Sequence, residues 1–137
     1  MATGVYNHGR YGISTGTINL ASDNLRCLIV ASAYVFNANH RFINIVAELA
    51  GTGYTRKTLA ARVVTEDAAS NRIVIKCADL VWPGAFFGTP DAAIIYKEGA
   101  DDLTRQLICS LDLSPKFTTN GGDFTVRINT LGFLVLQ

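Results

Sequence analysis

Short apolar runs separated by turn-forming residues fill the last third of the chain and most constrain its fold. Each run is about five residues long and rich in Ile, Leu, Val or Phe. Gly, Asp, Asn and Pro occupy the breaks between the runs, and this pattern favours strands over helices. We therefore expect four strands joined by tight turns in an antiparallel meander, over Ala93–Tyr96, Leu107–Leu111, Phe124–Ile128 and Gly132–Leu136.

Composition narrows the class of protein. The 137 residues are 49% hydrophobic and 17% charged, which suits one packed domain and argues against disorder. The chain has 12 Lys and Arg residues and 11 acids, so it lacks the excess of positive charge that attracts nucleic acid. The apolar runs are far shorter than the roughly 20 residues of a membrane helix, and the first residues contain no secretory h-region. We expect neither a nucleic-acid nor a membrane partner.

The first 16 residues differ from the rest in composition. They are rich in Gly, Tyr and Asn and show no hydrophobic periodicity, so residues 1–16 are predicted to form an extended N-terminal arm. Residues 17–137 are predicted to form a single domain. Its further strands are expected at Leu25–Ala31 and Arg72–Ala78, with weaker candidates at Thr17–Leu20 and within Thr52–Val64.

One short helix is expected after Asn37 or Asn39, ending at Gly51, because Phe42, Ile45, Val46 and Leu49 recur at helical spacing. The segment from Leu80 to Pro90 holds two prolines and two glycines and is predicted to be a loop. The fold class that follows is mainly β: an antiparallel β-sandwich or partly open β-barrel with one short helix and an extended N-terminal arm.

No pattern indicates catalysis, a cofactor or a metal. His8 and His40 have no nucleophile elbow beside them in sequence. Cys27, Cys77 and Cys109 lie within apolar strands, where thiols are usually core fillers. The acids near Glu98 lack the spacing of a calcium loop and are better explained as turn residues. We expect a protein that is not an enzyme, with no catalytic, cofactor-binding or metal-binding residues.

Aromatic side chains in two segments are the candidates for binding a partner. An isolated arm cannot bury its own aromatic rings, and aromatic residues in a Pro/Gly loop either plug the end of the sandwich or anchor another subunit. The candidate partner-binding residues are Val5, Tyr6, Tyr11, Trp82, Phe86 and Phe87.

An ordered set of segments resembles a family of small tailed-bacteriophage virion proteins. The set begins with Gly16–Asn37 and continues through ELAGTGYTRKTLAARVVT, NRIVIKCADLVW, AAIIYKEG, LICSLD and GGDFTV. It covers nearly the whole chain after residue 16. The chain departs from the family pattern in its third cysteine-bearing strand, Leu107–Leu111, which bears on packing rather than on role.

The resemblance implies a non-enzymatic building block of the virion: a capsid decoration, or cement, protein that binds and stabilises the assembled shell. The implied partner is the major capsid protein of the same virus. The resemblance further implies that this chain is made in the host cytoplasm and then binds the capsid exterior as a homo-oligomer or symmetric array. The alternatives are a tail, neck or head-fibre-base component, or a surface glycan-binding module in which Trp82 stacks on a sugar.

Overall fold

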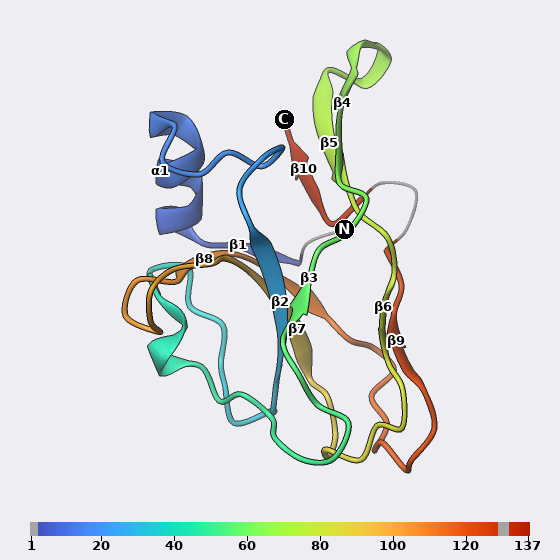
Figure 1. Cartoon of the computed structure of the whole chain (residues 1–137). Coiled ribbons are helices and arrows are strands. Elements are labelled where there is room, and N and C mark those ends of the chain that lie inside the picture. The colour runs from blue at the N-terminus through green and yellow to red at the C-terminus, as the bar shows by residue number, and fades with distance from the viewer. Residues whose placement is uncertain (1–2, 129–131) are drawn as a thin grey trace.

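A computed structural model describes residues 3–128 and 132–137, and its architecture is mainly β with antiparallel pairing throughout (Figure 1). The largest sheet has the order β1-β8-β7-β2-β3, formed by Gly4–Val5, Gln106–Asp112, Ala92–Lys97, Leu25–Val30 and Lys57–Thr58 in that order. A three-stranded sheet has the order β10-β5-β4, from Leu134–Leu136, Arg72–Lys76 and Val63–Asp67. The third sheet pairs β6 (Leu80–Trp82) with β9 (Phe124–Val126).

The main sheet is covered on both faces, as expected for strands as apolar as β2. Alternate residues of a strand point to opposite faces. On one face Cys27, Ile29 and Ile95 join a core with the other two sheets, including Trp82 and Phe133. Side chains of the opposite face pack against residues of the segment 31–47, in a second cluster that contains Leu28, Val30, Ile94, Tyr34 and Ile43. This sandwich-like arrangement confirms the mainly β, antiparallel part of the predicted fold class.

The predicted meander holds only for its first hairpin. β7 pairs with β8 as expected, but β9 pairs with β6 and β10 pairs with β5. Both late strands are three residues long, and each completes a sheet begun earlier in the chain. Sequence adjacency does not reveal such distant pairings, and residues 129–131, within the last predicted turn, lie outside the described residues.

The predicted N-terminal arm is wrong for the described residues 3–16. Gly4 and Val5 form β1 on the edge of the main sheet, and Asn7–Thr15 form helix α1. Tyr6 between them is fully buried, and its hydroxyl lies 2.8 Å from the Tyr34 hydroxyl. The helix shows little apolar periodicity because its two buried residues are Gly9 and Gly12. An added Cβ at Gly9 would lie 2.8 Å from Ile108 Cα, so glycine lets the helix approach β8 closely.

Four further local predictions need correction. The segment from Leu80 to Pro90, predicted to be a loop, begins with strand β6, Leu80–Trp82. The expected helix after Asn37 shrinks to a single 3-10 turn, Ile43–Ile45, in keeping with its β-branched residues. Thr17–Leu20 is not a strand, although Ile18 and Leu20 are buried. The strand expected within Thr52–Val64 is split into β3 and the start of β4, with Ala61 between them at φ +53°.

Strands β4 and β5 form a hairpin that projects from the body of the molecule (Figure 1). Its turn contains the 3-10 turn Ala68–Ser70 and Asn71 in the left-handed conformation. Two side-chain contacts of Asp67 fix this turn: it accepts from the Ser70 amide and pairs with Arg72 at 2.9 Å. No helix within the described residues is long and apolar enough to cross a membrane.

Candidate interaction surfaces

The six predicted partner-binding residues fall into two groups in the structure. Tyr6, Trp82 and Phe87 are core side chains, and Val5 is partly buried in β1. Only Tyr11 and Phe86 are well exposed, at 64% and 62%. Two of the predicted aromatic rings therefore lie on the surface, Tyr11 on helix α1 and Phe86 in the loop after β6.

Trp82 is held inside by specific contacts. Its indole Nε1 donates a hydrogen bond to the Thr55 carbonyl at 2.7 Å, and its ring packs against Phe124 at a centroid distance of 5.8 Å. The Lys57 ammonium lies 5.9 Å from the centroid of its ring. Because the ring is fully buried, it offers no face on which a sugar could stack.

Phe86 projects from a loop that is fixed by backbone hydrogen bonds. Its own N–H donates to the Thr52 carbonyl at 2.9 Å. The flanking residues are tied to the loop before β9: Gly121 N donates to the Ala85 carbonyl at 2.7 Å, and Phe87 N donates to Thr119 Oγ1 at 2.9 Å. We call these two joined loops, residues 83–90 and 114–123, the aromatic end.

The aromatic end has a buried side and an exposed side. Phe87 packs beneath it against Tyr54 and Phe124, with ring centroids 5.2 and 6.0 Å apart. Phe117 is largely exposed and touches Phe124 edge-on at 5.7 Å. The surface thus carries two apolar rings on an ordered base, an arrangement suited to anchoring in a pocket of a partner.

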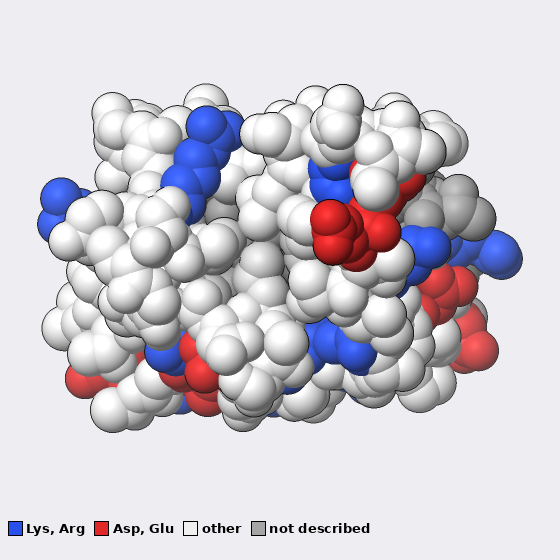
Figure 2. Space-filling model, turned by 90° about the horizontal axis from the view of Figure 1, so that it is seen from above, with Lys and Arg blue, Asp and Glu red and all other residues white. Residues whose placement is uncertain are grey.

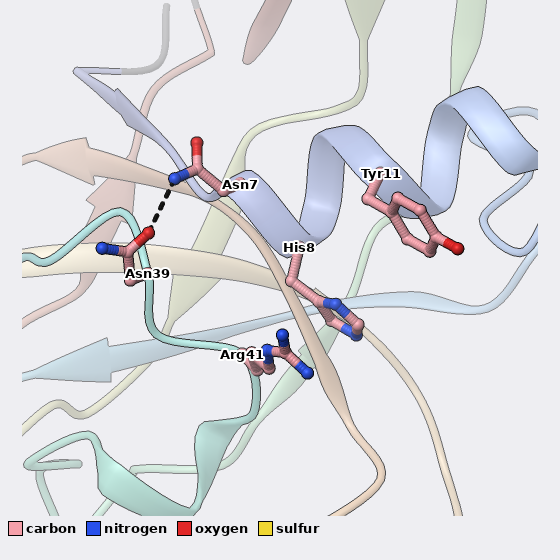
Figure 3. A pocket seen from close by; sticks show the side chains of 5 residues that line it. All are labelled: Asn7, His8, Tyr11, Asn39 and Arg41. Carbon is pink, nitrogen blue, oxygen red and sulfur yellow. Dashed lines mark hydrogen bonds between the residues drawn. The ribbon is translucent and has the colours of Figure 1, made fainter.

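A polar hollow lies beside helix α1 (Figure 3). It has a volume of about 560 Å³ and is lined by Asn7, His8, Tyr11, Asn39 and Arg41. Asn7 Nδ2 donates to Asn39 Oδ1 at 2.9 Å, which joins the helix start to the 37–41 loop. The His8 ring stacks near Tyr11 at 6.4 Å and meets Phe42 edge-on at 5.3 Å.

The electrostatics of this hollow do not resemble those of a hydrolytic site. Burial, and then the nearby Arg41 charge, lower the pKa of His8. Its ring contacts the Gln106 amide and has no hydrogen bond to a carboxylate among the described residues. A triad base is held by a carboxylate and aimed at a nucleophile, so the hollow offers one guanidinium and polar amides but no activated nucleophile. The other histidine, His40, has its own hydrogen-bond partner, because its Nδ1 lies 2.9 Å from the Tyr34 hydroxyl.

The acids near the β7–β8 turn are engaged by arginines. Glu98 pairs with Arg26 at 2.8 Å and with Arg105, while Asp102 pairs with Arg105 at 2.7 Å. Arg56 also pairs with Asp102, at 3.1 Å, and extends the network to Glu48, at 2.8 Å. Over residues 3–128 and 132–137, no group of three or more His, Cys, Asp or Glu residues is placed to hold a metal ion.

The charges are dispersed over the surface seen from above in Figure 2. Basic and acidic side chains occur side by side over the right part of this view, and no large patch of one sign appears.

Between α1 and β10 a groove of about 410 Å³ is lined by Val5, Arg10, Ile13, Ser14, Val135, Leu136 and Gln137.

A comparison of the chain with models of protein families, with curated proteins and with solved structures gave no match.

Proposed function

We propose that this chain is a non-enzymatic structural protein of a tailed-bacteriophage virion that decorates the capsid exterior and binds the major capsid protein. The family resemblance supplies the class of assembly. The observation that carries the role is the exposed Phe86 ring on the hydrogen-bonded aromatic end. Such a ring loses little conformational freedom when it enters a pocket, so most of its burial energy favours binding.

The proposed mechanism is mass action. A protein that binds the assembled shell but not its separated subunits stabilises the shell by RT ln(1 + [L]/Kd) at every site. A capsid repeats its sites many times, so a modest affinity per site becomes a large total. This mechanism needs no chemical step. Of the six predicted partner-binding residues, the proposal keeps the exposed Tyr11 and Phe86 as contacts, with Phe86 as the principal anchor.

The test is binding to purified particles that lack this chain. Phe86→Ala should weaken attachment about 30-fold, the effect of losing an anchor that contributes about 2 kcal/mol. The variant should keep the circular dichroism spectrum and melting temperature of the parent, since its ring is largely exposed. Leu103→Ala is the matched control, because Leu103 is equally apolar and exposed but lies in the β7–β8 turn.

Equal attachment of the Phe86 and Leu103 variants would remove the aromatic end from the proposal. Copy number in purified particles separates the two virion roles: stoichiometry near that of the major capsid protein supports decoration, whereas a few copies support a tail, neck or head-fibre-base component. Absence of the chain from the particles would refute both.

A further inference from the structure

Strand β4 has an open edge and exposed faces. It is the outer strand of the sheet β10-β5-β4, with β5 as its neighbour. Four of its five residues are exposed. Successive side chains point to opposite faces, so neither face of β4 is covered; Val63 is 54% and Val64 43% exposed.

An open strand edge with exposed valines is unusual because it is ready to pair with another strand. Natural proteins protect such edges with charged side chains, proline, bulges or a covering loop, and on β4 the charges lie only at the Glu66–Asp67 end. Val63, Val64 and Thr65 form a β-branched run without proline, and the hairpin projects beyond the body (Figure 1). This geometry suits strand addition, in which main-chain hydrogen bonds supply affinity and side-chain pairs supply specificity.

The sequence around β4 is complementary to itself in one antiparallel register. With Val64 on a twofold axis, Val64 faces Val64, Val63 faces Thr65, and Arg62 faces Glu66 on both sides. Cross-strand β-branched pairs and opposite charges each stabilise a sheet by about 0.2–1 kcal/mol. Moving the axis to Thr65 would instead set the carboxylates of Glu66 and Asp67 against valines, and the charge pairs would be lost.

The existing contacts leave these charges free to pair. Asp67 is already held by Arg72, whereas Glu66 makes no ion pair with the residues the structure describes. Arg62 directs its Nη1 to the Leu20 carbonyl at 2.8 Å, and its other guanidinium nitrogens remain as donors. A single acid and a single base therefore flank the valines in the order that a twofold partner requires.

We propose that two copies of this chain join through their β4 strands, antiparallel, with Val64 on the axis. The two three-stranded sheets then form one continuous sheet across the dimer. This pairing goes beyond the proposed function and does not rest on it. Since only a short strand from each copy is buried, the dimer is expected to be weak and to form at the upper end of a concentration series.

Sedimentation equilibrium of the full chain, up to about 1 mM at low salt, tests the dimer. Arg62→Glu and Glu66→Arg should each weaken self-association at least tenfold, because each sets like charges opposite one another. An equimolar mixture of the two variants should associate again, since every facing pair is then opposite in sign. Arg127→Glu, the same charge reversal at an exposed residue after β9, should leave the dimer unchanged.

The mixture also controls for folding, because a misfolded variant would not regain association. A monomer at every concentration would overturn the proposal. A dimer that is insensitive to both variants, or a mixture that stays monomeric, would overturn it equally, by moving the contact to another surface or register. Loss of particle binding by Phe86→Ala does not depend on any of these outcomes, so the two proposals can fail separately.

Discussion

Glu98 shows how a single residue ties the main sheet together at its β2–β7 end. Its carboxylate accepts from Arg26 on β2 and from Arg105 before β8, and the Gly99 amide donates to it at 3.0 Å. Burial by itself would raise the pKa of Glu98. The hydrogen bonds from Arg105, Arg26 and Gly99 outweigh that effect and lower the pKa to about 2. The folded state therefore favours the charged carboxylate.

This shift predicts a pH-dependent contribution to stability. A carboxylate with a depressed folded pKa stabilises the protein fully above its unfolded pKa and ceases to do so as pH falls through the folded pKa. Glu98→Gln should lower the free energy of unfolding at pH 7 by about 1–3 kcal/mol, from the loss of charged hydrogen bonds. The difference between parent and variant should shrink between the ordinary pKa of 4.5 and about 2, as measured by urea unfolding at several pH values. A difference that is constant across this range would contradict the assignment.

At the scale of elements, apolar runs predict the long strands well. They do not predict helix α1, which packs through glycines, or the pairing of β9 and β10 with strands distant in sequence. The sequence predicts β2, β5, β7 and β8 because each contains a short run rich in Ile, Val, Leu or Ala. Helix α1 was missed because its contact with the sheet is made by glycines, which leave no apolar stripe in the sequence. For the candidate surfaces, the sequence grouped Trp82, Phe86 and Phe87 as rings that either plug the sandwich or anchor a partner, and of these three only Phe86 is exposed. The sequence could not separate Phe86 from its neighbour Phe87, since that depends on which side of the loop faces the core.

The docking of α1 can be tested at Gly9. Alanine in an exposed helix is about 1 kcal/mol better than glycine. Here the added Cβ would meet Ile108 Cα and the Leu107 carbonyl at 2.8 Å, and such overpacking costs about 1–3 kcal/mol. Gly9→Ala should therefore destabilise the protein in denaturant unfolding. Ser14→Ala, on the exposed part of the same helix, should be neutral or slightly stabilising; a stabilising Gly9→Ala would show that the helix does not lie on β8.

At the scale of the whole molecule, the sheets are completed by strands from distant parts of the chain. β1 pairs with β8 through Gly4 and Ser110, β6 with β9 through Trp82 and Phe124, and β10 with β5. A single core cluster includes residues of β2, β5, β6, β8, β9 and β10. Removing either end of the chain thus exposes part of this core, and we infer that the domain unfolds as one unit.

The three free cysteines make that cooperativity measurable. Cys27 and Cys109 are buried strand residues; burial raises the pKa of Cys109 to about 12 and raises that of Cys27 as well. Cys77 is only partly buried, and burial followed by the Asp79 charge raises its pKa to about 11. Since the thiolate is the reactive form, a thiol reagent at pH 8 should label Cys77 first and slowly. In Cys77→Ser, the two remaining thiols should react in one phase whose denaturant dependence matches that of global unfolding. Two separate phases, or rapid labelling of Cys109 in the native protein, would mean that part of the core opens independently.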